Sequence, residues 1–167
     1  MDSFVKLVTQ DFPQFSFVGS NQFRWSSKDQ EISYDESAKD PAGLWAFLHE
    51  LGHGLLNHQE YHSDFGLLKL EVAAWQEAEQ LAEKYKLKID KDHVQNCLDS
   101  YRDWLHRRST CPNCGTHSVQ TDDKSYRCFN CHSTWQVTTS RFCRPYRKSS
   151  LAQNKKSLKQ EAQAIFI

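Results

Sequence analysis

The segment 47–57, FLHELGHGLLN, carries two histidines and a glutamate at the spacing of a zinc-binding helix. Residues i and i+4 of an α-helix lie on one face about one turn apart, so His49 and His53 can direct two imidazole nitrogens toward one ion. Glu50 follows the first histidine, where its carboxylate could accept the proton of a zinc-bound water. This is the HExxH pattern. The leucines around the motif favour a helix packed into a core over a solvated helix. Histidine and glutamate side chains in such a helix need partners, because buried polar groups are costly without them.

A catalytic zinc ion has three protein ligands and one open position for water. The segment 64–85, DFGLLKLEVAAWQEAEQLAEKY, has the apolar periodicity of a helix, and Glu71 falls inside its apolar stripe. A carboxylate on the buried face is costly unless it is paired or bound to a metal. The sequence therefore predicts Glu71 as the third ligand. The alternatives are a glutamate at the helix edge that reaches water and a buried pair with a lysine.

Two other histidines compete with Glu71 for the third ligand position. His58 comes directly after the predicted end of the HExxH helix, and His62 lies in the following loop, which makes His62 the better rival. The metzincin pattern HExxHxxGxxH needs a histidine six residues after His53, and Gln59 stands there instead. The chain therefore lacks the metzincin ligand set.

Four cysteines form two CxxC pairs, CPNC at 111–114 and CFNC at 128–131, with 13 residues between the pairs. Each CxxC turn can present two thiolates to one ion, and two such turns at this distance indicate a structural zinc site. The intervening residues and the following STWQV predict three short strands, so a zinc ribbon is expected. Four thiolates close the coordination sphere, and the predicted ligands are Cys111, Cys114, Cys128 and Cys131.

The elements that would position these residues follow from periodicity and turn signals. A short N-terminal helix ends at Pro13, and the stretch 15–34 predicts three short antiparallel strands in a meander. Asp40 and Pro41 mark the start of the HExxH helix, since Asp favours the cap position and Pro the first turn. A further helix is expected near 92–106. The predicted fold class is α+β: a zincin-like domain made of the meander, the HExxH helix and further helices, followed by a small zinc ribbon.

Charge is unevenly distributed along the 167 residues, although the net charge is zero. Residues 1–103 carry 18 acidic and 10 basic side chains, whereas residues 104–167 carry 3 acidic and 11 basic ones. We therefore predict a zincin-like metallopeptidase domain at 1–108, a zinc ribbon at 109–140 and a basic tail at 141–167. The basic part would favour an anionic partner such as nucleic acid.

The apolar runs of the sequence are all shorter than the roughly 20 residues that a membrane span needs. The N-terminal segment has no secretory pattern. Six cysteines without such a signal are typical of metal sites and free thiols in a reducing compartment. The expected location is the cytoplasm, with no membrane partner.

Residues 12–85 resemble the ImmA/IrrE-like family of small bacterial and phage metallopeptidases. The resemblance rests on the strands, on LWAFLHELGHGLLNH at 44–58 and on LEVAAWQEAEQLA at 70–82. In that family the second helix carries an ExxA-type motif with the metal-binding acid, which matches Glu71 and Ala74. The resemblance implies a zinc-dependent endopeptidase that acts on a repressor or another regulatory protein. A zinc ribbon stands where the C-terminal parts of the family would be expected, so the substrate class is not carried over.

The order of the predicted domains also resembles SprT-like proteases, which place a zinc ribbon after an HExxH domain and act on protein bound to DNA. Their third ligand is a histidine in an HGxxF-like motif. This chain has HSDFG at 62–66, with the glycine displaced, so this resemblance ranks second.

The sequence thus predicts a zinc metallopeptidase with a gluzincin-like ligand set, one catalytic and one structural Zn²⁺, and a protein substrate. Glu50 would be the catalytic base. Tyr34, Tyr61 and His62 are candidates for a donor that stabilises the transition state, and the sequence does not rank them. An extended substrate would add to the free edge of the meander.

The rival hypothesis is a nucleic-acid- or protein-binding adaptor whose zincin domain is an inactive scaffold. Such an adaptor would bind through the ribbon and the tail, where aromatic residues alternate with many basic ones. These residues are Arg107, Arg108, Arg127, Arg141, Arg144, Arg147, Lys148, Lys155, Lys156 and Lys159, with Tyr126, Trp135 and Tyr146 among them. Glu50 counts against this hypothesis, because an inactive scaffold does not need the base.

Overall fold

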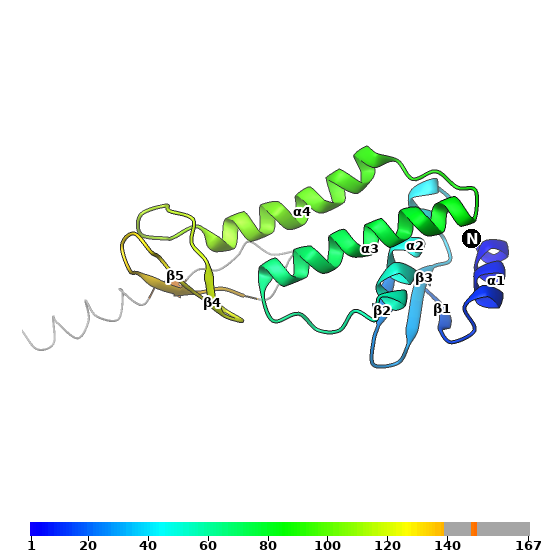
Figure 1. Ribbon diagram of the computed structural model, residues 1–167, viewed down its shortest axis with the longest axis horizontal. Coiled ribbons are helices and arrows are strands. Elements are labelled where there is room, and N and C mark those ends of the chain that lie inside the picture. The colour runs from blue at the N-terminus through cyan, green and yellow to red at the C-terminus, as the bar shows by residue number, and fades with distance from the viewer. Residues whose placement is uncertain (139–147, 150–167) are drawn as a thin grey trace, which may run out of the picture. The chain divides into compact units, whose positions relative to one another are not determined.

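The computed structural model describes residues 1–138 and the short strand Lys148–Ser149 (Figure 1). Most of the predicted basic tail, 141–167, lies outside the described residues. The described part contains four helices and two small sheets, which confirms the predicted α+β class. None of its helices is long and apolar enough to cross a membrane.

The chain forms two compact units. The first consists of Met1–Tyr61 and Gly66–Asp99, and the second consists of His62–Phe65 and the described residues from Ser100 onward. The three domains expected from the sequence remain a prediction.

The first unit contains one helix and three strands before the HExxH helix. They are α1 (Asp2–Asp11), β1 (Ser16–Ser20), β2 (Arg24–Ser26) and β3 (Glu31–Asp35), and the HExxH helix is α2 (Pro41–Leu55). Two longer helices follow, and each contributes residues to both units: α3 (Asp64–Lys84) and α4 (Lys91–Ser109).

The sheet of the first unit is mixed, which corrects the predicted antiparallel meander. Its strand order is β1-β3-β2, and β2 pairs antiparallel with β3. β1, however, runs parallel to β3, with Phe17 opposite Ile32. Alternating side chains indicate which residues share a face of a sheet, but they carry no information about which strands are neighbours. The central strand is the one that carries the fully buried Ile32.

α2 begins at the predicted cap. Asp40 Oδ1 accepts a hydrogen bond from the N–H of Gly43 at 2.9 Å, and Pro41 is the first residue of the helix. The apolar face of α2 is packed into the core of the first unit. Its fully buried side chains include Phe47, Leu48 and Leu51.

The C-terminal end of α2 is a Schellman motif. Asn57 has a left-handed backbone with φ of 50°, and its N–H donates to the carbonyl of Gly54 at 2.9 Å. The N–H of His58 donates to the carbonyl of His53 at 3.0 Å. In this motif the side chains of the residues joined by the longer bond also meet. The reversal of the chain therefore brings His58 back against His53.

Gly52 allows α2 to approach α3 closely. A Cβ atom at position 52 would lie 2.6 Å from the backbone oxygen of Ala74, a separation that side chains do not tolerate. Ala74 lies on α3, three residues after Glu71. A larger residue at position 52 would therefore hold Glu71 away from the histidines of α2.

The second unit contains a four-stranded antiparallel sheet. Its strands, in spatial order, are β4 (Gln120–Asp122), β5 (Ser125–Arg127), β6 (Thr134–Gln136) and β7 (Lys148–Ser149). Tyr126 and Trp135 stack across β5 and β6 with ring centroids 5.4 Å apart. Both rings are buried, at 2% and 1% exposure. They belong to the core of this unit and are therefore not available to a nucleic acid, as the rival adaptor hypothesis would require.

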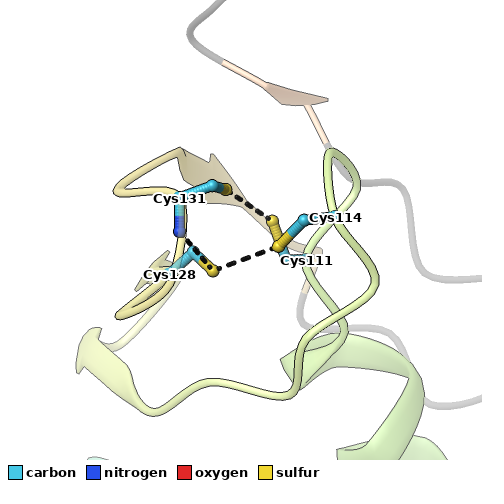
Figure 2. Close-up of side chains that lie close together, drawn as sticks. All are labelled: Cys111, Cys114, Cys128 and Cys131. Carbon is cyan, nitrogen blue, oxygen red and sulfur yellow. Dashed lines mark hydrogen bonds between the residues drawn. The ribbon is translucent and has the colours of Figure 1, made fainter.

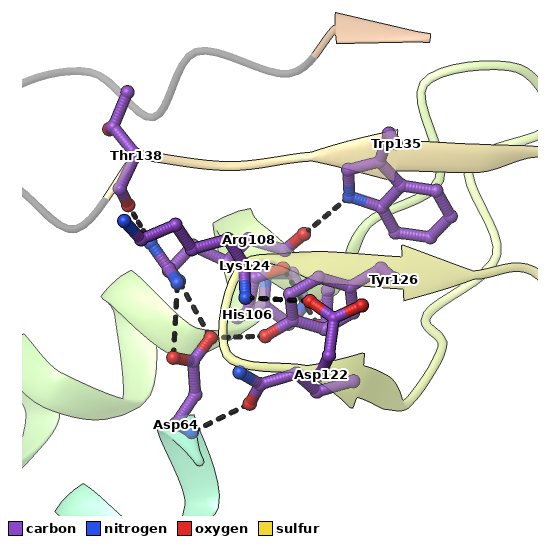
Figure 3. A network of polar contacts seen from close by, with 10 residues as sticks. Asp64, His106, Arg108, Asp122, Lys124, Tyr126, Trp135 and Thr138 are labelled. Atoms are coloured by element: carbon purple, nitrogen blue, oxygen red, sulfur yellow. Dashed lines mark hydrogen bonds and ion pairs between the residues drawn. The ribbon is translucent and has the colours of Figure 1, made fainter. Parts of the chain in front are cut away.

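A buried ion pair connects the first residue of α3 to the last turn of α4 (Figure 3). Arg108 donates through Nε to Asp64 Oδ2 at 2.6 Å and through Nη2 to Asp64 Oδ1 at 3.1 Å. The Tyr126 hydroxyl also donates to Asp64, and Arg108 donates to the carbonyl of Thr138. Arg108 is only 1% exposed, so it is a structural residue and does not join the basic side chains available to a partner.

Candidate metal centres

His49, His53 and Glu71 come together as the sequence predicts. His49 Nε2 lies 3.1 Å from Glu71 Oε2, and His53 Nε2 lies 3.1 Å from His49 Nε2 and 3.7 Å from Glu71 Oε1. Ligand atoms about 2.1 Å from a tetrahedral zinc ion lie about 3.4 Å from one another. The three side chains can therefore bind one metal ion as they stand.

The surroundings of Glu71 favour the charged form of its carboxylate in spite of its burial. Glu71 is 6% exposed. Burial alone would raise its pKa, but the hydrogen bond to His49 and the neighbouring His53 hold the pKa well below the usual range of a glutamate. A buried, ionised carboxylate flanked by two imidazoles is a donor set that suits a divalent cation such as zinc. No lysine pairs with Glu71 among the described ion pairs.

Glu50 lies beside this cluster, at the wall of a small cavity. Its Oε2 accepts a hydrogen bond from the backbone N–H of Trp25 at 2.7 Å, so β2 holds the carboxylate in place. The cavity has a volume of about 220 Å³. Its lining residues come from β2 and the residue before it, from α2 and from α3: Phe23, Arg24, Trp25, Glu50, His53 and Glu71.

His58 does not take the third ligand position. Its Nδ1 lies 2.9 Å from Nδ1 of His53, on the side of that ring opposite Nε2. The indole Nε1–H of Trp25 donates to the backbone carbonyl of His58 at 2.9 Å. Burial and the neighbouring His53 lower the pKa of His58. The rival ligand His62 is exposed, belongs to the second unit and is not among the clustered groups.

The residues named as transition-state donors do not line the cavity beside Glu50. Tyr34 packs its ring against Phe47 with centroids 5.9 Å apart, and Tyr61 is 39% exposed. Arg24 does line the cavity, and sequence reasoning missed it because one arginine on a short strand has no distinguishing pattern.

The four cysteines form a second cluster (Figure 2). Cys111 Sγ lies 3.6 Å from Cys131 Sγ, and Cys114 Sγ lies 3.5 Å from Cys128 Sγ. Zinc–sulfur bonds of about 2.3 Å place tetrahedral sulfurs about 3.8 Å apart, so the spacing suits one ion. All four are free cysteines.

The two CxxC turns supply backbone hydrogen-bond donors to two of the four sulfurs. The N–H of Asn113 donates to Cys111 Sγ at 3.4 Å, and the N–H of Cys131 donates to Cys128 Sγ at 3.5 Å. Hydrogen bonding, chiefly with Ser133, lowers the pKa of Cys131 to about 5. Burial raises the pKa of Cys111 to about 11. A bound cation would favour the thiolate at all four positions.

The described residues thus contain two groups of side chains that are able to bind a metal, one with nitrogen and oxygen donors and one with sulfur donors. The first has an adjacent carboxylate and cavity, whereas the second has a full set of four ligands. The chain matches no protein-family model, no curated protein and no solved structure.

Proposed function

We propose that this chain is a zinc-dependent endopeptidase with a zincin-like domain, acting on a peptide bond of a protein substrate. The observation that carries the proposal is the convergence of His49, His53 and Glu71, with Glu50 held beside them at the cavity. The resemblance to ImmA/IrrE-like enzymes makes a regulatory protein the first substrate class to test. The cysteine cluster would hold a second, structural zinc ion.

The roles of the residues follow from the positions of their side chains. Zinc held by His49, His53 and Glu71 would polarise the scissile carbonyl and make a water acidic near neutral pH. Glu50 would accept the proton of the attacking water and return it to the leaving amine. The N–H of Trp25 orients Glu50 for this transfer. Arg24 lines the same cavity and would be the candidate to face the negative charge that develops on the carbonyl oxygen.

Zinc counting combined with a cleavage assay tests the proposal. We expect two zinc ions per full-length chain, one in Glu71→Ala, and two in the matched control Glu83→Ala, which alters an exposed glutamate of the same helix. Glu50→Gln should retain two zinc ions and lose cleavage of an unfolded protein such as reduced casein by at least about 100-fold. A parent with one zinc ion, lost only in Cys111→Ser, would exclude the peptidase.

The second unit supports an adaptor function as the alternative. Arg107, Lys124 and Arg127 are exposed, and Phe129 at the second CxxC turn is 68% exposed. Binding to DNA that weakens steeply with salt would support this reading. DNA that accelerates cleavage would instead favour a SprT-like protease acting on DNA-bound protein.

A further inference from the structure

The imidazole of His53 has two different environments on its two nitrogen atoms. Nε2 faces His49 and Glu71, at 3.1 and 3.7 Å, whereas Nδ1 lies 2.9 Å from Nδ1 of His58. The rings of His53 and His58 are steeply inclined, at 75°, with centroids 4.9 Å apart. An imidazole that binds a metal through Nε2 carries its proton on Nδ1. Nδ1 of His53 must then donate a hydrogen bond, and Nδ1 of His58 is the acceptor in reach.

Two elements hold His58 in this position. The Schellman motif at the end of α2 joins the His58 N–H to the His53 carbonyl, and Asn57 supplies the left-handed turn that it needs. From the other side, the Trp25 indole donates to the His58 carbonyl. The same Trp25 holds Glu50 through its backbone N–H. Both the backbone N–H and the backbone carbonyl of His58 are therefore hydrogen-bonded, and these two bonds hold the His58 imidazole against that of His53.

The other histidine of the HExxH motif has no such partner. His49 Nδ1 is buried and has no hydrogen-bond partner among the described residues. Its ring is held by packing instead, against Trp75 with centroids 4.4 Å apart. His53 is thus the ligand whose orientation depends on a hydrogen bond.

We propose that His58 is a positioning residue for the metal site: it accepts the Nδ1–H of His53 and holds that ring in the tautomer that leaves Nε2 free for the metal. The inference rests on the proposed zinc site but not on the hydrolytic activity. Partners of this kind also raise the basicity of the ligand, and their loss typically weakens metal binding by about 10- to 100-fold.

Three variants of the full chain separate the hydrogen bond from simple packing. His58→Leu keeps an apolar side chain against His53 and removes the acceptor. His58→Asn restores an acceptor, because the asparagine Oδ1 takes nearly the position of a histidine Nδ1. Asn57→Gly is the control, because it favours the left-handed turn and leaves His58 unchanged.

Zinc affinity and imidazole tautomers are the two readouts. Competition with a chelator gives the affinity of each site, and the four-cysteine site serves as an internal reference. Long-range proton–nitrogen correlation spectra of the zinc-free protein report which nitrogen of His53 carries the proton before the metal binds. We expect His58→Leu to weaken only the histidine site, by about 10- to 100-fold, and to lose the single Nδ1–H tautomer of His53 in the zinc-free protein. His58→Asn should recover most of the affinity, and Asn57→Gly should match the parent in zinc affinity and in the tautomer of His53.

Three results would overturn the role of His58 while leaving the zinc site standing. One is a His58→Leu protein that binds zinc as tightly as the parent. A second is a zinc-free parent in which His53 lacks an Nδ1–H, a measurement that needs no variant. Equal losses in His58→Leu and His58→Asn with the fold intact would also reject the acceptor role. A parent without zinc at the histidine site would overturn this inference and the proposed function together.

Discussion

Replacing Asp64 with alanine should destabilise the second unit by about 4 kcal/mol. Asp64 supplies both of its oxygens to Arg108 and accepts the Tyr126 hydroxyl as well. Removing one partner of a buried ion pair costs about 3–5 kcal/mol, because the other charge stays in the interior. An unsatisfied Tyr126 hydroxyl adds roughly 1 kcal/mol. The hydrogen bond from Arg108 to the Thr138 carbonyl remains in the variant, so the expected loss of stability lies toward the lower end of the summed range.

Removing the charges of both Asp64 and Arg108 provides the decisive comparison. The double variant Asp64→Ala with Arg108→Met leaves no buried charge, so it should be more stable than Asp64→Ala alone. Asp123→Ala, at an exposed aspartate of the same unit, should be close to the parent.

Guanidinium denaturation of the zinc-loaded chain would measure these differences. The indole N–H signals of Trp104 and Trp135 report on the second unit, and Trp135 Nε1 donates to the Arg108 carbonyl. A loss below about 1 kcal/mol for Asp64→Ala, or a double variant less stable than the single one, would refute the reasoning.

Three further predictions follow from local geometry. Gly52→Ala should destabilise the first unit by about 1–3 kcal/mol and weaken zinc binding, because the new methyl group meets the Ala74 carbonyl. A denaturation curve and a zinc titration measure the two effects. A variant more stable than the parent would contradict this prediction. In the zinc-free chain at pH 7, iodoacetamide should label Cys131 well before Cys111, because their pKa values are shifted to about 5 and about 11. Mass spectrometry follows the labelling, and bound zinc should protect both thiols. Equal labelling rates of Cys131 and Cys111 would contradict the opposite pKa shifts of the two thiols. Asn57→Gly should stabilise the first unit by up to about 1 kcal/mol, because glycine adopts the left-handed conformation without strain; any loss in thermal stability would argue against that cap.

Local periodicity was sufficient to predict the helices and the placement of Glu71. The 3.6-residue repeat puts Glu71 on the buried face of α3, and the structure brings it to 3.1 Å from His49. The two CxxC turns likewise gather four sulfurs, since each turn fixes its own pair. The metal, and the role of each residue toward it, remain predictions.

Prediction from the sequence is wrong, or makes no statement, for contacts between residues that lie far apart in the sequence. The parallel pairing of β1 with β3 depends on which strand occupies the centre of the sheet, and alternation does not encode that. Arg108 follows another arginine in a polar helix, which is the usual pattern of a solvated face. Its partner Asp64 lies 44 residues earlier, beyond the reach of any local pattern.

The contact of His58 with His53 could have been predicted. Asn57 follows the last leucines of the helix, and asparagine is the residue other than glycine that most readily takes the left-handed turn. The residue after such a turn returns to the last turn of its helix. Treating His58 only as a possible ligand overlooked this signal.

The strand order of the first sheet also governs when the sheet can form. β3 is the strand that pairs with both β1 and β2, and it is the last of the three to be synthesised. During translation the first 30 residues therefore contain two strands that have no strand partner. The sheet can form only after β3 leaves the ribosome, because β2 pairs with β3 as a hairpin and β1 pairs with β3 across the intervening β2 segment. The backbone amide that holds Glu50 thus reaches its place only after the central strand has arrived.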